Sequence, residues 1–498
     1  MHNDYDILII GSGLGGLVCG YILSKNGLKT AVLEKQPVLG GCLQSFVRQD
    51  VRFETGMHYI GSIRPGEALH RFFSYLDLVK DMQLDMLDRD GYDIISCRGD
   101  RYAFANGREA FIETLARKFP HERQNLQRYM ETIRQIGQSS PLYSFSHFDS
   151  INLLSPEYVK VSVNESVEGI VEDPVLQEVL VGNLPLYAGR RDHTPMYVHA
   201  LISDFYNHSA ARIVGGSDAI ARSLAASIRR HGGTCLTSQQ VTAIDCNTEK
   251  AVAVRTASGE RFTARYIVSD IHPELLIDMV DSHLFRHAYK ERIRSMQQTV
   301  SNFTVYLKFK PDCMPYQRHN FFHYRKDVWN CEDYTPADWP RNFLYMHQAA
   351  EPQARWARNA VLIAYMRWDE VQQWAGTTLH HRGQDYEEFK QRKAELLLDA
   401  LEHEMPGTKA AIEAYWTSTP LTYRDYTGTK EGSMYGIMRD KNFPTQTLVT
   451  QRTKIPNLFL TGQNINSHGI LGVIIGAILT CSEIIGADTI IRQIQQHN

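Results

Sequence analysis

The sequence predicts an α/β fold in which a parallel sheet with a β-meander is assembled from three separated parts of the chain. The first part is a strand–turn–helix–strand unit within the first 35 residues. The second, Ile213–Asp270, has the pattern of a helix followed by three short alternating strands. The third runs from a buried type of strand at Asn457–Thr461 into an apolar helix at Ile470–Ile485.

Two long insertions separate these parts, and both mix helical patterns with aromatic loops. We expect them to form a second, discontinuous α+β domain that binds the substrate and carries a helical lid. The sheet domain is then expected at residues 1–61, 210–275 and 451–498, and the second domain at 62–209 and 276–450.

The composition excludes several classes of protein. The 498 residues suit two or three domains. Lys and Arg total 53 and Asp and Glu total 56, which argues against a nucleic-acid partner held by bulk charge. An apolar share of 43% excludes a disordered chain. The eight cysteines show no CxxC spacing, so we expect no metal site and a reducing, cytoplasmic location.

A glycine pattern marks the turn between the first strand and the first helix. Gly11, Gly13 and Gly16 follow the strand Tyr5–Ile10, and Glu34 ends the second strand. Such glycines allow a tight turn, a close approach of the backbone to a pyrophosphate and close helix–strand packing. The Glu34 carboxylate is expected to accept hydrogen bonds from ribose hydroxyls and to repel a 2′-phosphate. These features predict a Rossmann-type dinucleotide-binding domain.

A second glycine pair, Gly40-Gly41, lies just beyond this acid. It indicates another close backbone approach, at the place where flavoproteins contact the ribityl chain, and so favours FAD over NAD; an ordinary turn is the alternative. Only one complete GxGxxG pattern is present. We therefore expect no separate NAD(P)H domain and an external electron donor or acceptor: a quinone, oxygen, a diffusible nicotinamide or a protein.

The C-terminal part carries a further signal. A strand ends at Gly462, and a helix is expected to begin at Gly469. The N–H groups at that helix start suit an electron-rich atom such as the pyrimidine end of a reduced flavin. Gly472 and Gly476 have the GxxxG spacing of some membrane helices. Because the clean apolar run is much shorter than the roughly 20 residues that span a bilayer, we interpret them as sites of close packing.

Together these parts resemble the phytoene desaturase family of FAD-dependent oxidoreductases, which includes carotenoid desaturases, carotenoid isomerases and retinol saturases. The resemblance covers nearly the whole chain. Three stretches look most like the retinol saturase branch: Phe53–Gly61, Thr422–Gly428 and Gly462–Gly469.

The resemblance implies roles for individual positions around FAD. The expected contacts are Gly11, Gly13, Leu14, Gly15 and Gly16 at the pyrophosphate, Glu34 and Lys35 at the adenosine ribose, Gly40, Gly41 and Gly56 along the flavin, Val241 at the adenine, and Gly462, Gln463, Gly469, Ile470 and Leu471 at the ribityl and pyrimidine portions.

The implied reaction adds or removes hydrogen across a C=C bond of an apolar polyene or isoprenoid lipid, with a hydride exchanged at flavin N5. Of the 71 residues from 280 to 350, 14 are aromatic, about twice the share in the whole chain. Aromatic side chains suit such a substrate, but plain core packing explains them equally well.

Saturation also requires a proton. His58 and Tyr59 are the candidates for this role, because they lie in the Phe53–Gly61 motif and imidazole titrates near neutrality. A structural His58 is an equal alternative. His468 precedes the last apolar helix and is a weaker candidate. Tyr423, Arg424 and Asp425 are expected on a strand or turn facing the pocket, with Arg424 and Asp425 as a structural polar pair.

An apolar substrate suggests peripheral contact with the cytoplasmic face of a membrane. The stretch Arg117–Arg134 carries five basic residues against two glutamates and fits either an anionic surface or a solvated helix face. We favour a retinol or carotenoid saturase. The alternatives are a desaturase or a polyene isomerase on the same scaffold and, more remotely, an amine oxidase or a prenyl-lipid-binding chaperone related to the GDP dissociation inhibitors.

Overall fold

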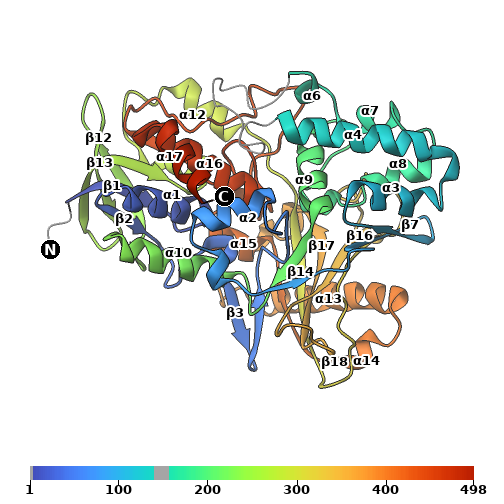
Figure 1. The fold of residues 1–498 in the computed structure, drawn as a ribbon. Coiled ribbons are helices and arrows are strands. Elements are labelled where there is room, and N and C mark those ends of the chain that lie inside the picture. Colours follow the sequence, from blue (N-terminus) through green and yellow to red (C-terminus); the bar gives the residue numbers. More distant parts are fainter. Residues whose placement is uncertain (1–3, 140–155, 498) are drawn as a thin grey trace.

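A computed structural model describes residues 4–139 and 156–497. Figure 1 shows a sheet covered by helices on the left, a layer of helices at the upper right and a second sheet below that layer. The mixed α/β class with a parallel sheet and a β-meander confirms the predicted fold.

The first sheet joins segments from both ends of the chain and from its middle. Strands β10, β2, β1, β13 and β19 are parallel, and β12 and β11 continue the sheet in antiparallel fashion. The bounds are β1 Asp4–Ile10, β2 Thr30–Leu33, β10 Thr234–Leu236, β11 Val241–Cys246, β12 Ala251–Thr256, β13 Arg261–Ser269 and β19 Leu458–Leu460.

Strand β13 pairs with β12 at its start and with β19 at its end. Asn457 bridges the point where those two strands part. Its side-chain amide donates hydrogen bonds to the carbonyl oxygens of Ala251 and Arg265, both at 2.8 Å. The C-terminal strand is therefore tied to the meander as well as to its sheet neighbour.

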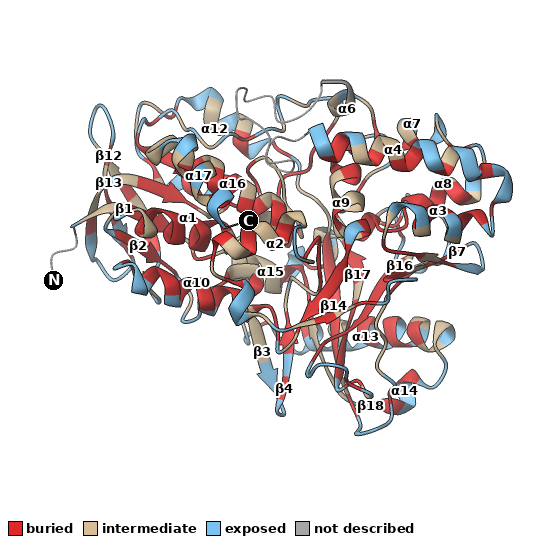
Figure 2. Ribbon diagram, in the orientation of Figure 1, coloured by how far each residue is buried: buried red, intermediate tan, exposed pale blue. Residues whose placement is uncertain are grey.

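Successive residues of β1 face opposite sides of this sheet, as strand geometry requires. Ile7 and Ile9 pack against a helical layer, whereas Leu8 and Ile10 pack against the meander and two shorter helices. Figure 2 shows the buried interior on both sides of the strands. The helical layer contains α1 Leu14–Lys25, α2 Ala68–Tyr75, α10 Asp218–Arg230, α16 Gly469–Ile485 and α17 Ala487–Gln496, and the shorter helices are α11 Pro273–Met279 and α12 His287–Arg294.

The two insertions build one sheet together. Its order is β18–β14–β17–β16–β15–β7–β8, in which β7 and β8 come from the first insertion and the rest from the second. The bounds are β7 Asp93–Cys97, β8 Asp100–Phe104, β14 Ser301–Phe309, β15 Asn320–Tyr324, β16 Asn342–His347, β17 Asn359–Met366 and β18 Ile412–Ser418.

The faces of this second sheet have different partners. Phe303 and Tyr345 belong to the core between this sheet and α13 (Gln384–Glu404), whereas Tyr306 and Leu344 belong to the core on the opposite face, under the helices of the first insertion. Of the 14 aromatic residues from 280 to 350, 11 are buried. The helices are α13 Gln384–Glu404 and α14 Thr408–Ala411 on one side, and α3 Arg108–Ala116, α4 Arg123–Ser139, α6 Pro156–Lys160, α7 Val163–Glu168, α8 Pro174–Leu180 and α9 Met196–His208 on the other.

Two small sheets connect the large ones. Strands β3 Ser45–Arg48 and β4 Val51–Glu54 form a hairpin, and β9 Ala210–Ile213 pairs with both β5 Ile60–Gly61 and β6 Leu84–Met86. Helix α2, which follows residue 61, packs in the core of the first sheet. The predicted boundary at residue 61 stays a prediction, because packing continues across it.

The GxxxG spacing in α16 has a packing role. A Cβ atom at Gly472 would lie 2.8 Å from the Ser467 side chain, so glycine lets the preceding loop fold back onto the helix. Among the described residues, no helix is long and apolar enough to cross a membrane.

Residues 423–425 do not form the expected strand or turn, because local capping signals make them helical. Helix α15, Pro420–Thr427, starts after Thr419, whose side chain accepts a hydrogen bond from the Leu421 N–H. Proline is favourable at the first helical position. Gly428, at φ 76°, ends the helix in the left-handed conformation that glycine favours.

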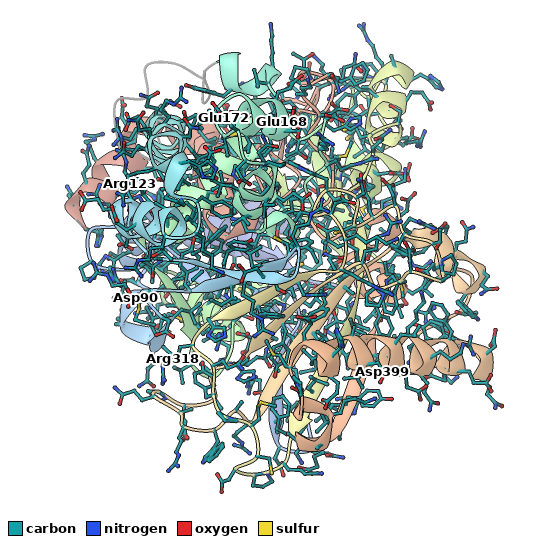
Figure 3. The ribbon with its side chains drawn as sticks, turned by 90° about the vertical axis from the view of Figure 1, so that its right-hand side faces the viewer. Asp90, Arg123, Glu168, Glu172, Arg318 and Asp399 are labelled. Carbon is teal, nitrogen blue, oxygen red and sulfur yellow. The ribbon has the colours of Figure 1, made fainter. Side chains whose placement is uncertain are left out.

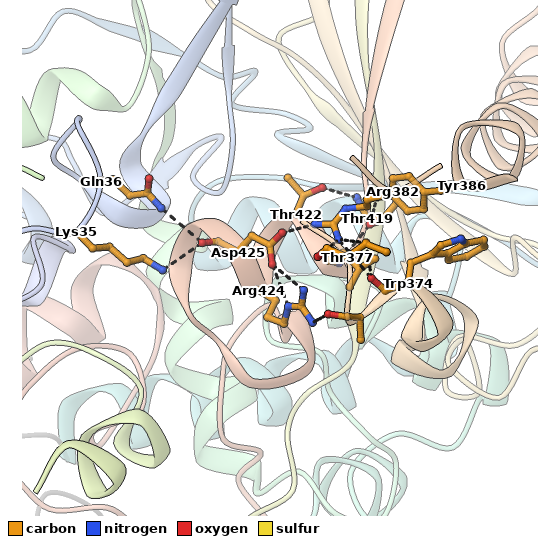
Figure 4. Close-up of polar contacts among 12 residues, drawn as sticks. Lys35, Gln36, Trp374, Thr377, Arg382, Tyr386, Thr419, Thr422, Arg424 and Asp425 are labelled. Atoms are coloured by element: carbon orange, nitrogen blue, oxygen red, sulfur yellow. Dashed lines mark hydrogen bonds and ion pairs between the residues drawn. The ribbon is translucent and has the colours of Figure 1, made fainter. Parts of the chain in front are cut away.

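Helix α15 is held by an ion pair with Arg382 and contacts the segment after β2 through its backbone (Figure 4). The Asp425 carboxylate pairs with Arg382, whose side chain is 3% exposed, and accepts hydrogen bonds from Arg424. Lys35 follows β2, and its ammonium group donates a hydrogen bond to the backbone carbonyl of Asp425 at 3.1 Å. The expectation that Arg424 and Asp425 form a structural polar pair is confirmed.

Asp425→Ala should lower the free energy of unfolding by about 3 kcal/mol, because it leaves the Arg382 guanidinium buried without its carboxylate. Urea unfolding followed by circular dichroism measures this change. Asp399→Ala, which removes an exposed partner of Lys409 (Figure 3), is the control and should cost less than about 1 kcal/mol. Equal losses in the two variants would contradict a special role for the buried pair.

Candidate functional site

A cavity of about 570 Å³ lies at the carboxyl ends of the parallel strands of the first sheet and is closed by the second domain. Open α/β sheets bind their ligands at this edge. Wall residues follow β1, β2, β13 and β19, and others come from β16 and β17 of the second sheet. One continuous cavity therefore contacts both domains.

Most of the predicted cofactor contacts lie on this wall. They are Gly11, Gly13, Leu14, Gly15, Glu34, Lys35, Gly40, Gly41, Gly56, Val241, Gly462, Gln463, Gly469 and Ile470. Gly16 and Leu471 are not on the wall. Gly16 packs instead against β1, where an added Cβ atom would lie 2.3 Å from the Gly11 carbonyl oxygen. Leu471 lies in the core of the first sheet.

The start of α1 forms a cradle of glycines around an acidic side chain, Asp270. An added Cβ atom would lie 2.5 Å from an Asp270 carboxyl oxygen at both Gly13 and Gly15, and 2.4 Å away at Gly462. Only glycines permit such an approach. Backbone N–H groups at a helix start attract anions, so the cradle fits a phosphate-sized anionic group.

Burial raises the pKa of Asp270 to about 7. The Gly16 and Gly13 N–H groups oppose this shift, whereas the nearby Glu34 carboxylate adds to it. One carboxyl oxygen, Oδ2, has no hydrogen-bond partner of normal geometry among the described residues. Asp270 is thus poised between its neutral and charged forms near neutral pH.

Glu34 has a second function besides facing the cavity. One carboxylate oxygen accepts hydrogen bonds from the Ser12 N–H at 3.0 Å and the Ser12 hydroxyl at 2.6 Å, and the other accepts one from Gln36 N–H. The Gly40 N–H in turn donates to the Ser12 hydroxyl oxygen. A carboxylate has about four acceptor positions, so one remains for a ribose hydroxyl. Ser12 thereby fixes both glycine turns to the acid.

The insertions supply a mostly apolar part of the wall. Among the described residues, they add no aspartate or glutamate to it. Their one cation there, Arg424, is paired with Asp425. None of the aromatic residues from 280 to 350 lies on the wall, so the aromatic side chains of that stretch serve the core and not the cavity. The apolar side chains are Pro185, Leu186, Leu344, Met346, Ile363 and Met434, with Tyr206, Tyr365 and Tyr435 beside them.

His58 and Tyr59 both lie on the cavity wall but differ in their partners. The Tyr59 hydroxyl donates a hydrogen bond to Asp93 at 3.1 Å. Burial raises the pKa of Tyr59 well above its usual range and that of Asp93 to about 7. In contrast, His58 Nδ1 is buried without a hydrogen-bond partner among the described residues and lies 3.8 Å from a Glu54 carboxylate oxygen. His58 therefore has the freer nitrogen.

His468 lies behind the wall and not on it. Its ring packs against Tyr435, a wall residue, with centroids 4.7 Å apart. Burial lowers the pKa of His468 to about 3, so the ring is neutral and does not serve as an acid near neutral pH. Tyr423 lies on the wall, and its hydroxyl donates to the Thr55 carbonyl at 2.7 Å.

Sequence reasoning missed Asp270 and Ser12. Asp270 follows directly after β13, which pairs with β1 in parallel, and this position at the sheet edge was the available signal. Ser12 occupies a variable position of the glycine pattern. Its role depends on the side-chain geometry of Glu34, which spacing alone does not give.

The basic stretch Arg117–Arg134 is largely neutralised by acids. Lys118 pairs with Asp100, Arg123 with Glu113 and Arg134 with Glu131. Figure 3 shows Arg123 on the surface, at the start of α4. These pairs favour the solvated helix face, and contact with a membrane stays a prediction.

Comparison with known proteins identifies a family and several relatives. Residues 14–485 match the family described as flavin containing amine oxidoreductase. The chain is 26% identical to human all-trans-retinol 13,14-reductase, over 96% of this chain and 85% of that protein. It is 24% identical to chloroplastic prolycopene isomerase 1 of an Oncidium hybrid cultivar, over 98% and 84% of the two chains.

Solved structures share the fold. An oxidoreductase from Methanosarcina mazei aligns with a TM-score of 0.64 at 16% identity and covers 95% of this chain and 99% of its own. A putrescine oxidase bound to putrescine aligns with the same TM-score at 14% identity, over 97% and 99% of the chains.

Gly13→Glu should abolish binding of the nucleotide cofactor, because the new side chain collides with Asp270 and adds a second negative charge to the cradle. The visible absorbance of the purified variant measures the loss of flavin. Gly376→Glu is the matched control, since nothing lies within 4 Å of a Cβ atom there. A yellow Gly13→Glu protein would contradict the assignment of the cradle.

Proposed function

The chain belongs to the flavin containing amine oxidoreductase family, and from that premise we propose that it is an FAD-dependent oxidoreductase that reduces C=C bonds of a polyene or isoprenoid lipid. The observation that carries this proposal is the wall supplied by the insertions, which is mostly apolar and has no carboxylate among the described residues. A hydrocarbon substrate gains free energy from apolar burial, about 25 cal/mol per Å². The relatives named as a retinol reductase and a prolycopene isomerase support the same class of substrate.

FAD fits the part of the cavity nearest the first sheet. The cradle at Gly13 and Gly15 would hold the pyrophosphate, and Glu34 the adenosine ribose. Gly469 and Ile470, at the start of α16, would face the pyrimidine portion. When bound, FAD supplies a carrier that accepts or delivers a hydride.

The residues of the chain then perform three tasks. Leu344, Met346 and Ile363 hold the hydrocarbon and exclude water from the cavity. The glycine turns fix the nucleotide against the edge of the sheet. His58 donates the proton that accompanies a hydride, because its imidazole lies on the wall of the cavity.

The amine oxidase alternative fits the wall less well. A protonated amine is favoured by a nearby carboxylate or by a cage of aromatic faces. The insertions supply Tyr206, Tyr365 and Tyr435 to the wall but no carboxylate among the described residues. A desaturase or an isomerase would use the same cavity, so those alternatives must be separated by chemistry. A prenyl-lipid chaperone would not require the glycine cradle.

For the location, we propose the cytoplasm, with transient contact at the cytoplasmic face of a membrane that stores the apolar substrate. The electron donor or acceptor is external to the chain. Pelleting of the protein with anionic vesicles, compared with neutral ones, tests the contact.

Under anaerobic conditions, the dithionite-reduced protein should be reoxidised by a polyene such as all-trans-retinol, with a product of greater mass by two hydrogens and shorter-wavelength absorption. Visible spectroscopy follows the flavin, and mass spectrometry follows the product. Reduction of the oxidised flavin by a polyene would indicate a desaturase instead. A product of unchanged mass would indicate an isomerase, and oxidation of an amine panel would contradict the proposal.

Asp270→Asn should remove a pH dependence of FAD binding. Because the pKa of Asp270 is raised to about 7, the carboxyl is neutral below that pH and becomes an anion above it. The anion repels the pyrophosphate, so the wild-type affinity for FAD should fall about fivefold from pH 6 to pH 8 for a coupling of about one pKa unit. The Asn variant should bind equally at both values.

Titration of the apoprotein with FAD, followed by flavin fluorescence, measures these affinities. Asp278→Asn, which alters an exposed aspartate on α11, is the control and should keep the wild-type pH dependence. The same pH dependence in Asp270→Asn would assign it to another group.

A further inference from the structure

Reduction of a double bond consumes one proton in each turnover, yet the substrate cavity must exclude water. If His58 gives that proton, its imidazole must be reprotonated before the next turnover. The structure contains a polar route that reaches His58 from the surface without passing through the substrate cavity. This inference rests on the proposed function.

The route begins in a second cavity of about 190 Å³ between the β3–β4 hairpin and the second sheet. Exposed residues line its mouth, among them Asp50, Arg52 and Arg358. Its inner wall includes the side chains of Glu54, Gln348 and Asn359, which are all buried. A polar cavity of this size has room for several water molecules.

Glu54 is the link between the two cavities. It is 5% exposed, and its carboxylate oxygen Oε2 accepts a hydrogen bond from Gln348 Nε2 at 3.1 Å. The same oxygen lies 3.8 Å from His58 Nδ1, the buried nitrogen without a partner. His58 itself lies on the wall of the large cavity, and Glu54 lies on the wall of the small one.

The neighbouring polar groups do not draw the Glu54 carboxylate away from His58. Arg52, on the same strand, pairs with Asp218 at 2.9 Å and not with Glu54. Gln348, on the facing side, is neutral and orients the carboxylate; its own carbonyl oxygen accepts a hydrogen bond from Asn359. The gap of 3.8 Å exceeds a hydrogen bond, so a small rotation of either side chain or one bridging water completes the contact.

We propose that Glu54 delivers protons from the second cavity to His58. In each turnover, a hydride from the reduced flavin and a proton from the His58 imidazolium form two C–H bonds and break one C=C π bond. Because His58 Nδ1 faces Glu54, the proton leaves the imidazole from Nε2. The ring then rotates to turn the bare nitrogen toward Glu54, which gives it a proton, and water in the second cavity restores Glu54. The flavin is oxidised by two electrons, which an external two-electron donor replaces. Glu54 thus acts through His58 and does not contact the substrate.

The experiment compares the first turnover with later ones in the flavin-containing protein. Prereduced protein is mixed with a polyene in a stopped-flow instrument, first without and then with excess dithionite. Glu54→Gln should leave the rate of the first turnover within about threefold of wild type, because proton delivery from Glu54 is needed only between turnovers, and should slow later turnovers about tenfold or more. Formate, which is small enough to enter the second cavity, should restore the later turnovers in part.

Two further variants distinguish proton delivery from a structural role. Glu54→Asp keeps an acid but shortens the side chain, whereas Glu54→Gln keeps the shape and the hydrogen bond from Gln348 but has no acid. Proton delivery therefore predicts faster later turnovers in Glu54→Asp than in Glu54→Gln, and a structural role predicts the reverse order. Asp50→Asn, at the mouth of the same cavity, should behave as wild type.

The outcomes separate this inference from the proposed function. If the polyene does not reoxidise the reduced wild-type protein, the proposed function fails and proton delivery fails with it. If the wild type turns over and Glu54→Gln matches it in later turnovers, proton delivery alone is overturned. A first turnover that is slowed as much as the later ones would also overturn it.

Discussion

The cofactor site depends on the parallel pairing of β1, β13 and β19, because the loops after these strands meet at the start of α1. Free backbone N–H groups at that helix start favour an anionic group. Three glycines leave room there, and Asp270 occupies the space in the structure. Segments more than 450 residues apart thus meet at one sheet edge.

Local signals in the sequence predicted these elements well. The glycine pattern, the acid at Glu34 and the meander strands depend on short-range rules of turn geometry and strand alternation, and the structure places them as expected. The helix at Pro420–Thr427 was predictable by the same rules, since Thr419, Pro420 and Gly428 are capping residues.

What the sequence did not reveal depends on contacts between distant segments. Glu54 and His58 are only four residues apart, but no pattern near them indicates that Glu54 borders a polar cavity built with residues such as Gly215 and Gln348. The aromatic stretch from 280 to 350 was ambiguous, because aromatic side chains suit a core and a lipid cavity equally. Its strands lie in the middle of a seven-stranded sheet with helices on both faces, and this topology directs the aromatic rings into the two cores.

The two candidate acids, His58 and Tyr59, are separated by their surroundings and not by their place in the motif. Tyr59 shares a buried hydrogen bond with Asp93, and loss of its proton would place a second negative charge beside that carboxyl group; burial and this neighbour hold the pKa of the phenol high. A phenol in such a setting is suited to fix the orientation of its segment. His58 has an unpartnered nitrogen directed at an acid that borders a polar cavity, so it can be reprotonated while the hydrocarbon is bound. A dry cavity for the substrate and a separate polar supply of protons are compatible only if one residue lies between them, and Glu54 has that position.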